Sequence, residues 1–292
     1  MGGLNMIRGL YSAASGLISQ QRRHDTITNN IANFETIGYK QKATPLSSFN
    51  DMLLQYTEPN STKSKQIGTW TGNVFAEEAV TLFQQGDLVQ TNRKGDFALV
   101  TNIQVPGMQF DSNGKYVDEN GQVTYQPQAY FTVADENGDV QYTRSGQFTA
   151  NANGELITNT GQRVIGNNGQ PIVLPAGVSL DQLTLGANGN LFTEAGEDTG
   201  VGFLISRVED PNRLIRVGDG SFRLPEGEEA QAIVADDNVA IMQNYIERSN
   251  VDYTQAQVEL MAAARAYEAN AQIIKYYDQT LNKAVNEIGK VN

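Results

Sequence analysis

The C-terminal stretch constrains the fold most, because it carries one long uninterrupted helical pattern. From Ser249 to Ile288, apolar or small residues recur at alternating intervals of four and three, and Gly289 is the first helix breaker. At 1.5 Å per residue, this helix would be about 60 Å long. Few compact domains need a terminal helix of that length, whereas a coiled coil with a partner helix does. The alternative is a long core helix packed on the chain's own β domain.

The start and the seam of this helix can be assigned from the sequence. Ser249 and Asp252 have the spacing of a capping box, with Ser249 as the N-cap and an acidic residue near the positive end of the helix. The predicted seam consists of Tyr253, Gln257, Leu260, Ala264, Tyr267, Ala271, Ile274, Asp278, Leu281, Val285 and Ile288. The alanines on this seam allow close approach of a second helix.

A second helical pattern lies at the N-terminus, from about residue 5 to residue 31. Its apolar stripe is thin and fades in the second half, and an isolated helix of this kind is marginal in water. The helix therefore needs a partner. An Asn-rich turn follows at Asn29–Asn33, and Gly38 can adopt the positive φ that a tight turn requires. The stripe consists of Ile7, Leu10, Ala14, Leu17, Ile27 and Ile31, widened by Tyr11 and Ile18.

Between the helices, the pattern from about residue 68 to residue 236 indicates β structure. Asn-Gly pairs occur six times, and Asn-Gly is typical of the type I′ turn that joins two antiparallel strands. Several short strands at this spacing predict an antiparallel β domain. The Asn-Gly pairs begin at residues 113, 120, 137, 153, 168 and 188, and the predicted strands are 128–134, 140–144, 155–158, 163–165, 171–174, 202–208 and 214–217.

The predicted fold class is therefore mainly β with α: a central antiparallel β domain flanked by long N- and C-terminal helices that pair as a coiled coil on assembly. The predicted regions are an N-terminal assembly helix with its Asn-rich turn, a polar linker, a β-rich outer domain with an inserted-looking stretch at 101–128, and a C-terminal assembly helix. Their boundaries are 1–40, 41–67, 68–236 and 237–292.

Composition excludes several kinds of function. The chain has no cysteine and one histidine, His24, so neither a thiolate nor a multi-histidine metal site can form. A net charge of −12 argues against nucleic-acid binding. No cleaved secretory signal and no membrane-spanning run is visible. We expect no catalytic residue, no cofactor, no metal and no membrane insertion. The Asp111–Lys115 segment departs from a calcium loop, because its glycine falls at position four.

Several segments together resemble the flagellar basal-body rod and hook family, the axial proteins of the bacterial flagellum. The size and the single β domain are most similar to its distal-rod (FlgG/FlhO-type) members. The stretch at 101–128 departs from that pattern. The segments that carry the resemblance are LYSAASGL at 10–17, NNIAN at 29–33, GYK at 38–40, YTRSGQF at 142–148, NGEL at 153–156, SNVD at 249–252 and RAYEAN at 265–270.

The resemblance implies a structural subunit that polymerises through its terminal helices into a hollow tube, which transmits torque and conducts exported subunits. It implies export by the flagellar type III apparatus without a cleaved signal, and a location in the basal body. The implied partners are further copies of the chain, other rod proteins, the rod cap, the hook and the export apparatus. The implied assembly residues are Leu10, Ala14, Leu17, Asn29, Asn30, Ile31, Ala32, Asn33, Gly38, Tyr39 and Lys40 at the N-terminal end, and Ser249, Asn250, Val251, Asp252, Leu260, Arg265, Tyr267, Glu268, Asn270, Ile274 and Leu281 at the C-terminal end.

The alternative from another class is an extracellular β-rich protein that binds cell-wall glycan and uses its helices only to oligomerise. Aromatic side chains clustered on one face of the β domain would favour this alternative. An enzyme is not expected, because His24 has no acid or nucleophile partner at a recognised spacing.

Overall fold

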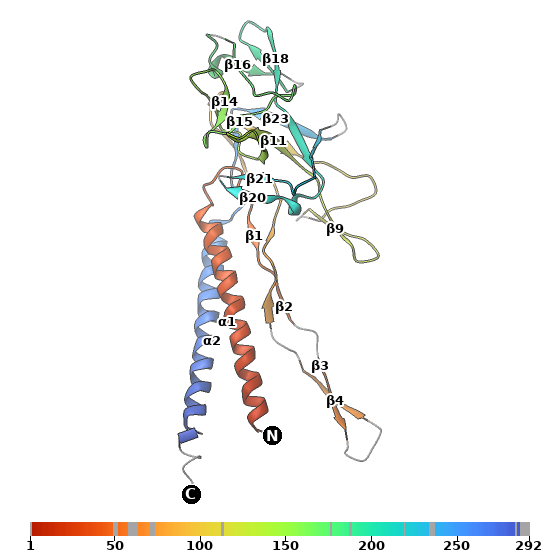
Figure 1. Ribbon diagram of the computed structural model, residues 1–292, viewed down its shortest axis with the longest axis vertical. Coiled ribbons are helices and arrows are strands. Elements are labelled where there is room, and N and C mark those ends of the chain that lie inside the picture. Colours follow the sequence, from red (N-terminus) through yellow and green to blue (C-terminus); the bar gives the residue numbers. More distant parts are fainter. Residues whose placement is uncertain are drawn as a thin grey trace. The chain divides into compact units, whose positions relative to one another are not determined.

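A computed structural model describes residues 2–48, 52–57, 64–70, 74–111, 114–175, 177–186, 189–218, 220–233, 237–283 and 285–286 (Figure 1). The chain forms two compact units. Unit 1 combines residues 1–32, 42–80 and 252–292, and unit 2 combines residues 33–41 and 81–251. Each unit is therefore built from segments that are far apart in the sequence.

Unit 1 contains two long helices, α1 (Gly2–Ala32) and α2 (Tyr253–Lys283), which lie side by side (Figure 1). Gly9 lies against Tyr277 and Gly16 against Asn270, while Arg23 pairs with Glu259 at 3.7 Å. The contacts advance along α1 as they move back along α2, so the two helices are antiparallel.

The rest of unit 1 is made of short strands that lie largely where the sequence predicts a linker at 41–67. The pairs β2–β5 and β3–β4 are antiparallel. A two-stranded ribbon needs no buried face, so no alternation of apolar residues marks it in the sequence. The strands are β1 (Lys42–Ala43), β2 (Leu46–Ser48), β3 (Met52–Thr57), β4 (Ser64–Trp70), β5 (Val74–Ala76) and β6 (Val80–Thr81), of which β6 has its first residue in unit 1 and its second in unit 2.

Unit 2 contains a nine-stranded antiparallel sheet with a main order of β13-β14-β15-β11-β12-β21-β20, in which β19 joins β11 and β22 joins β19. This confirms the predicted β-rich domain flanked by helices. Strand β11 has the predicted bounds, whereas the predicted strand 171–174 forms only isolated bridges. The sheet strands are β11 (Gln128–Ala134), β12 (Val140–Thr143), β13 (Phe148–Ala150), β14 (Leu156–Thr158), β15 (Arg163–Val164), β19 (Ile205–Val208), β20 (Ile215–Gly218), β21 (Ser221–Arg223) and β22 (Gln231–Ala232).

Smaller sheets complete unit 2. Two short 3-10 turns, Leu180–Gln182 and Pro211–Arg213, connect strands. The stretch at 101–128 that looks inserted contributes the hairpin β9–β10. The remaining strands are β7 (Leu88–Gln90), β8 (Phe97–Thr101), β9 (Lys115–Val117), β10 (Val123–Tyr125), β16 (Leu183–Leu185), β17 (Asn190–Thr193), β18 (Asp198–Gly202), β23 (Val239–Gln243) and β24 (Tyr245–Glu247).

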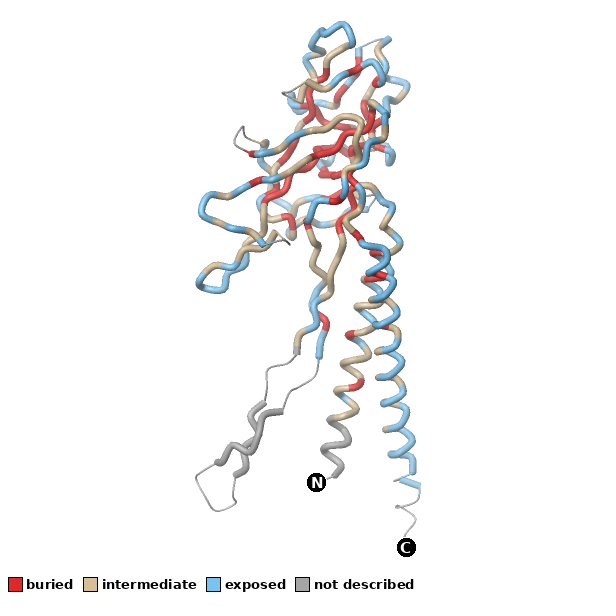
Figure 2. The backbone as a smooth tube through the Cα atoms, turned by 180° about the vertical axis from the view of Figure 1, so that it is seen from behind, coloured by how far each residue is buried: buried red, intermediate tan, exposed pale blue. Residues whose placement is uncertain are grey.

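The core of unit 2 is aromatic. Phe97, Phe131, Phe148 and Phe203 form one cluster, with the Phe97 and Phe203 ring centroids 4.8 Å apart. Full burial of each such side chain contributes about 1.5–3 kcal/mol. Figure 2 shows the buried stretches of unit 2 gathered in its interior. This core gives unit 2 a source of stability of its own.

The Asn-Gly turns differ in type from the prediction. At Asp135–Asp139, Gly138 has φ +91° but Asn137 does not have a positive φ, so the turn is not type I′. The Gly138 N–H donates to the Asp135 carbonyl and the Asp135 N–H to the Asp139 carbonyl, as in a type I turn followed by a glycine bulge. The Asp135 carboxylate accepts the N–H groups of Asn137 and Asp139, which holds the asparagine in the helical region.

The same arrangement recurs at residues 118–122 and 151–155. The useful sequence signal is therefore the Asp or Asn three residues before the glycine. Asn113 and Asn188, which belong to two of the predicted Asn-Gly pairs, lie outside the described residues.

The C-terminal helix begins later than the predicted boundary at 237, because β23 and β24 precede it and pair with β8 and β7. Its N-cap is Asp252, whose carboxylate accepts the Gln255 N–H at 3.0 Å. Ser249, the predicted N-cap, instead accepts the Val251 N–H at 3.3 Å. The capping-box assignment to Ser249 is therefore wrong, since the segment that contains it belongs to unit 2.

Candidate functional site

The side of α2 that packs in unit 1 follows a heptad spacing that agrees with the prediction in part: Leu260, Ala264, Ala271 and Ile274 are half-buried. Ala256 and Ala263 are buried, whereas the predicted positions Gln257 and Asp278 are exposed. The residues at 262, 263 and 264 are all alanine, so the heptad spacing fits whichever of them faces α1. The sequence alone therefore does not determine which alanine is buried. The buried and half-buried residues of α2 are Ala256, Glu259, Leu260, Ala263, Ala264, Ala266, Asn270, Ala271, Ile274 and Tyr277.

Of the other predicted residues on α2, Leu260, Asn270 and Ile274 are half-buried. Arg265 and Glu268 are exposed, and Tyr267 and Leu281 are exposed by 38% and 40%. The exposed residues are free to meet a neighbouring molecule. Ile288 at the predicted end of the seam lies outside the described residues.

Helix α1 approaches α2 through small residues. A Cβ at Gly9 would collide with the Tyr277 ring, and one at Gly16 would lie 3.1 Å from the Asn270 amide nitrogen. Ala13, midway between them, is buried. The small side chains therefore set the close helix spacing.

The predicted apolar stripe of α1 is only partly covered. Leu10, Ala14 and Leu17 are half-buried, while Tyr11 is 63% and Ile18 53% exposed. Much of the apolar surface of α1 thus lies outside the contact with α2.

Polar side chains join α1 to the strands of unit 1. Ser19 Oγ donates to the Val74 carbonyl at 3.2 Å, and Arg22 donates to the Ala76 carbonyl at 3.3 Å. Asn30 is buried and bonds both backbone groups of Lys42: its Nδ2 donates to the carbonyl at 2.7 Å, and its Oδ1 accepts the N–H at 3.0 Å. The Asn30 amide therefore acts as a strand partner, which accounts for an asparagine at this position.

The other residues of the Asn-rich motif have different surroundings. Asn29 and Ala32 are exposed, and Ile31 and Asn33 are half-buried. The Asn33 carbonyl accepts the Thr36 N–H at 3.1 Å, which closes the turn after the helix.

In unit 2, Lys40 belongs to a buried ion cluster that we call the junction cluster, formed by Lys40, Arg144 and Glu247. Lys40 Nζ lies 2.6 Å from Glu247 Oε1, and Arg144 Nη2 lies 2.9 Å from Glu247 Oε2. All three side chains are at most 2% exposed. The cluster joins the segment that enters unit 2 to the segment that leaves it.

Hydrogen bonds extend the junction cluster. Lys40 donates to the Gln84 carbonyl at 2.7 Å, and Glu247 Oε1 accepts the Gly86 N–H at 3.0 Å. Arg144 donates to the Ala129 carbonyl at 2.7 Å. The buried charges are therefore both paired and hydrogen-bonded, as buried ions must be to persist.

The junction cluster has two cations for one carboxylate. Burial acts to raise the pKa of Glu247, but the positive charges of Arg144 and Lys40 outweigh it and hold that pKa below its ordinary value. Burial lowers the pKa of Lys40 to about 8, although Glu247 opposes this shift. Glu247 thus stays ionised, and Lys40 is the member that releases its proton first on the alkaline side.

Asn250 forms a second set of hydrogen bonds between the first and last segments of unit 2. Its Oδ1 accepts the Gln41 N–H at 2.6 Å, and its Nδ2 donates to the carbonyls of Leu82 and Gln84 at 3.0 and 3.2 Å. Val251 next to it is buried. The first and last segments of unit 2 are thereby held together.

Tyr39 is buried, and the Arg216 guanidinium lies 4.7 Å from its ring centroid. Burial raises the pKa of Tyr39. Gly38 has φ +69°, and a Cβ there would lie 2.9 Å from the Arg144 backbone carbon. The GYK motif, which the resemblance assigns to assembly, therefore packs within the chain's own unit 2.

Two residues that complete this site, Arg144 and Glu247, are not among the predicted assembly residues. Arg144 lies in the YTRSGQF motif but had no assigned role, and Glu247 had no motif at all. Arg144 directly follows strand β12, and Glu247 is the last residue of strand β24. A charge that is buried at such a position needs a partner. The sequence does not identify that partner, because Glu247 lies 103 residues after Arg144 and 207 residues after Lys40.

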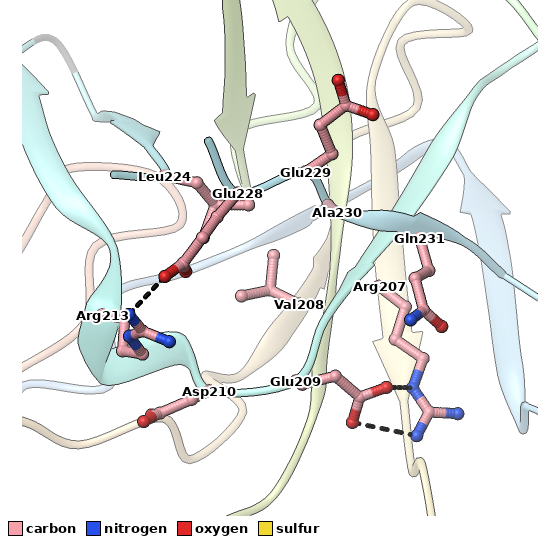
Figure 3. Close-up of a pocket in the computed structure, with 10 residues that line it drawn as sticks. All are labelled: Arg207, Val208, Glu209, Asp210, Arg213, Leu224, Glu228, Glu229, Ala230 and Gln231. Carbon is pink, nitrogen blue, oxygen red and sulfur yellow. Dashed lines mark hydrogen bonds and ion pairs between the residues drawn. The ribbon is translucent and has the colours of Figure 1, made fainter. Parts of the chain in front are cut away.

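Unit 2 also contains a pocket of about 230 Å³ (Figure 3). Charged side chains that line this pocket form ion pairs with one another: Arg213 pairs with Glu228, and Arg207 Nε lies 2.9 Å from Glu209 Oε1. Among the residues that the structure describes, no group of three His, Cys, Asp or Glu side chains is placed to hold a metal ion. None of the described helices is long and apolar enough to cross a membrane.

The surface of unit 2 bears on the glycan-binding alternative. Among its described residues, the exposed large apolar side chains are all valine or isoleucine: Val89, Val117, Val123, Val140, Val173, Ile215 and Val217. The aromatic cluster that would favour a glycan-binding face is not found among them.

Comparison with known proteins agrees with this architecture. Residues 10–40 match the family described as flagella basal body rod protein, residues 126–193 the flagellar hook protein FlgE/F/G D1 domain, and residues 242–287 the flagellar basal body rod FlgEFG protein C-terminal region. The first and third matches include most of α1 and α2, and the second covers part of unit 2.

Full-length relatives extend the likeness to nearly the whole chain. The flagellar hook-basal body complex protein FlhO of Bacillus subtilis is 34% identical, covering 98% of this chain and 100% of its own. The flagellar basal-body rod proteins FlgG of B. subtilis and Borreliella burgdorferi are 29% and 27% identical, covering 96% of this chain and 99% and 98% of their own. This chain therefore belongs to the flagellar basal-body rod and hook family, as a structural rod subunit located in the basal body of the bacterial flagellum.

Proposed function

We propose that the chain polymerises through unit 1, with α1 and α2 pairing as a coiled coil and packing against the helices of neighbouring copies to form a hollow tube. The supporting observation is the outer face of α2. Val258, Met261 and Tyr276 are 53%, 55% and 64% exposed, and they lie on the side of the helix away from Ala256 and Ala263. These apolar side chains would be covered in a polymer.

Energetics favours assembly over an isolated helix pair. Ordering a residue costs about 1–2 kcal/mol, and full burial of one aliphatic side chain contributes about 1.5–3 kcal/mol. The α1–α2 contact is made largely by glycine and alanine, which bury little apolar area. The exposed apolar residues on both helices supply the missing area once neighbours pack on them.

Charge also favours unit 1 as the assembly surface. Unit 1 has ten basic and ten acidic residues, whereas unit 2 has 11 basic and 23 acidic residues, so the net charge of −12 resides in unit 2. Neutral surfaces approach one another without the self-repulsion of like charges. Packing through unit 1 in a head-to-tail manner builds an open filament instead of a closed dimer.

On this proposal the protein has a mechanical function and no catalytic one. The tube would transmit torque and conduct exported subunits, and the chain itself would leave the cell through the flagellar type III apparatus. Its partners would be copies of itself, the other rod proteins, the rod cap and the hook.

The test is assembly of the purified full-length protein, observed by electron microscopy. Val258→Asp and Tyr276→Asp should each abolish filaments, because they place a charge in the proposed contact. Gln257→Glu is the matched control, since it adds a charge at an exposed position on another face of α2. Filaments of normal length from either Asp variant would overturn the proposal.

A further inference from the structure

The hairpin β9–β10, which we call the arm, projects from the body of unit 2 (Figure 1). Val117 and Val123 are directly opposite partners in its two strands, so their side chains share one face. They are 51% and 40% exposed. Asp118 and Glu119 follow in the turn. The arm therefore presents a pair of valines beside two acidic residues.

A second exposed apolar pair lies on β20. Ile215 and Val217 are 44% and 48% exposed, and Val217 is the extra residue at a bulge between Arg216 and Gly218 in the pairing with β21. Arg223 on β21 is the direct partner of Ile215, is exposed, and makes no ion pair within the described part of the chain. Strand β20 ends the main path of the sheet. This face therefore presents two β-branched side chains beside one unpaired cation.

The two faces are complementary in apolar character and charge, because each presents two β-branched side chains and the acidic turn of the arm is opposite in charge to Arg223. Because unit 2 has 23 acidic and only 11 basic residues, most contacts between two copies of it are repulsive. A cation beside exposed apolar side chains is an exception on such a surface.

From these observations we infer that the arm of one copy docks on the β20–β21 face of the next copy, with Val117 and Val123 against Ile215 and Val217 and the acidic turn beside Arg223. The inference rests on the proposed polymerisation and adds a contact outside the helices. Because the two faces are different patches of the same chain, the contact is head-to-tail and continues along a filament. It also assigns a role to the segment 101–128.

Disulfide cross-linking tests the contact directly, because the chain has no cysteine of its own. The full-length variants Val123→Cys and Ile215→Cys are mixed under assembling conditions and oxidised. We expect a disulfide-linked dimer that contains one chain of each. Val140→Cys replaces Ile215→Cys as the matched control, since Val140 is 52% exposed on unit 2 but lies outside the proposed contact. Its mixture should give little or no dimer.

Charge exchange provides a second measurement. Arg223→Glu and Glu119→Arg should each raise the critical concentration for assembly about two- to fivefold, as expected for an exposed ion pair. The double variant should return toward the wild-type value. Thermal unfolding of each variant should match the wild type, because these positions are on the surface.

The outcomes separate the two proposals. Filaments that form normally but give no more Val123–Ile215 dimer than the control mixture would overturn the arm contact and leave assembly through unit 1 intact. Failure of the wild type to assemble at all would overturn both. If the critical concentration of the double charge variant is as high as that of the worse single variant, Arg223 does not lie beside the acidic turn of the arm.

Discussion

Units 1 and 2 are stabilised in different ways. Unit 2 has an aromatic core around Phe131 and Phe203 and a buried ion cluster. In the described part of unit 1, the buried side chains are mostly small or polar, such as Ala13, Asn30 and Ala263. The comparison indicates that unit 2 has a core within one chain, whereas unit 1 leaves many of its large apolar side chains exposed.

The largest effect should come from removing the carboxylate of the junction cluster in unit 2. Glu247→Gln leaves Lys40 and Arg144 buried without their counter-ion, and breaking a buried pair in this way costs about 3–5 kcal/mol. The measurement is denaturant unfolding of unit 2, followed by near-UV circular dichroism. Glu228→Gln is the control, because its ion pair with Arg213 is more exposed and contributes about 0–1 kcal/mol. A cost for Glu247→Gln equal to that of the control would show that the cluster contributes little.

The next largest expected effect is a rise in the free energy of unfolding at alkaline pH, caused by Lys40. Its pKa is about 8 in the folded protein and 10.5 without burial, so the unfolded chain binds more protons between these values. Stability should therefore rise as pH increases through this window, by an amount approaching about 3 kcal/mol from this group. Above pH 10 the raised pKa of Tyr39 acts in the opposite direction, because the folded state then retains the extra proton.

The control for the pH profile is Lys40→Met, which removes the titrating group but keeps an unbranched side chain. Its free energy of unfolding should rise less between pH 8 and 10 than that of the wild type. Parallel profiles for the two proteins would show that Lys40 is not the group responsible.

In unit 1, Asn30→Ala should cost about 1–3 kcal/mol, because it leaves the backbone groups of Lys42 without their partner. The readout is helical circular dichroism during unfolding. Gln21→Ala, at an exposed position on the same helix, should change stability by less than about 0.5 kcal/mol. If both variants behave alike, Asn30 does not hold the strand to α1.

The smallest effect concerns the start of α2. Asp252→Ala should cost about 1 kcal/mol, because it removes the N-cap acceptor for the Gln255 N–H. Ser249→Ala should leave the melting of the helix nearly unchanged. The reverse ranking of the two variants would restore Ser249 as the helix cap.

Several parts of the fold could be predicted because their causes are local. The bounds of β11 follow from its own apolar run, and the heptad spacing of α2 follows from its own sequence. Which alanine of α2 is buried could not be predicted, because the residues at 262, 263 and 264 are all alanine and only the position of α1 selects Ala263. The strands in 41–67 were missed because their pairing does not require a buried face.

The predicted assembly residues show the same difference between local and long-range causes. Their motifs can be found in the sequence, but the residues that surround them in the fold cannot. Lys40 lies in a motif that suggests a contact with another subunit, yet it is buried with Glu247, 207 residues further along the chain. Asn30 could be assigned to a turn, but its bonds to Lys42 depend on where the chain passes after that turn.

The helical ends, the antiparallel β middle and the family can be predicted from the sequence, because periodicity, turn residues and motifs are properties of short segments. Which face of α2 is covered, which residue caps it and which charges meet in the junction cluster are known only from the folded chain. Those features depend on contacts between segments distant in the chain. The free energy of burying a charge or an apolar side chain is set by the whole surroundings of that side chain.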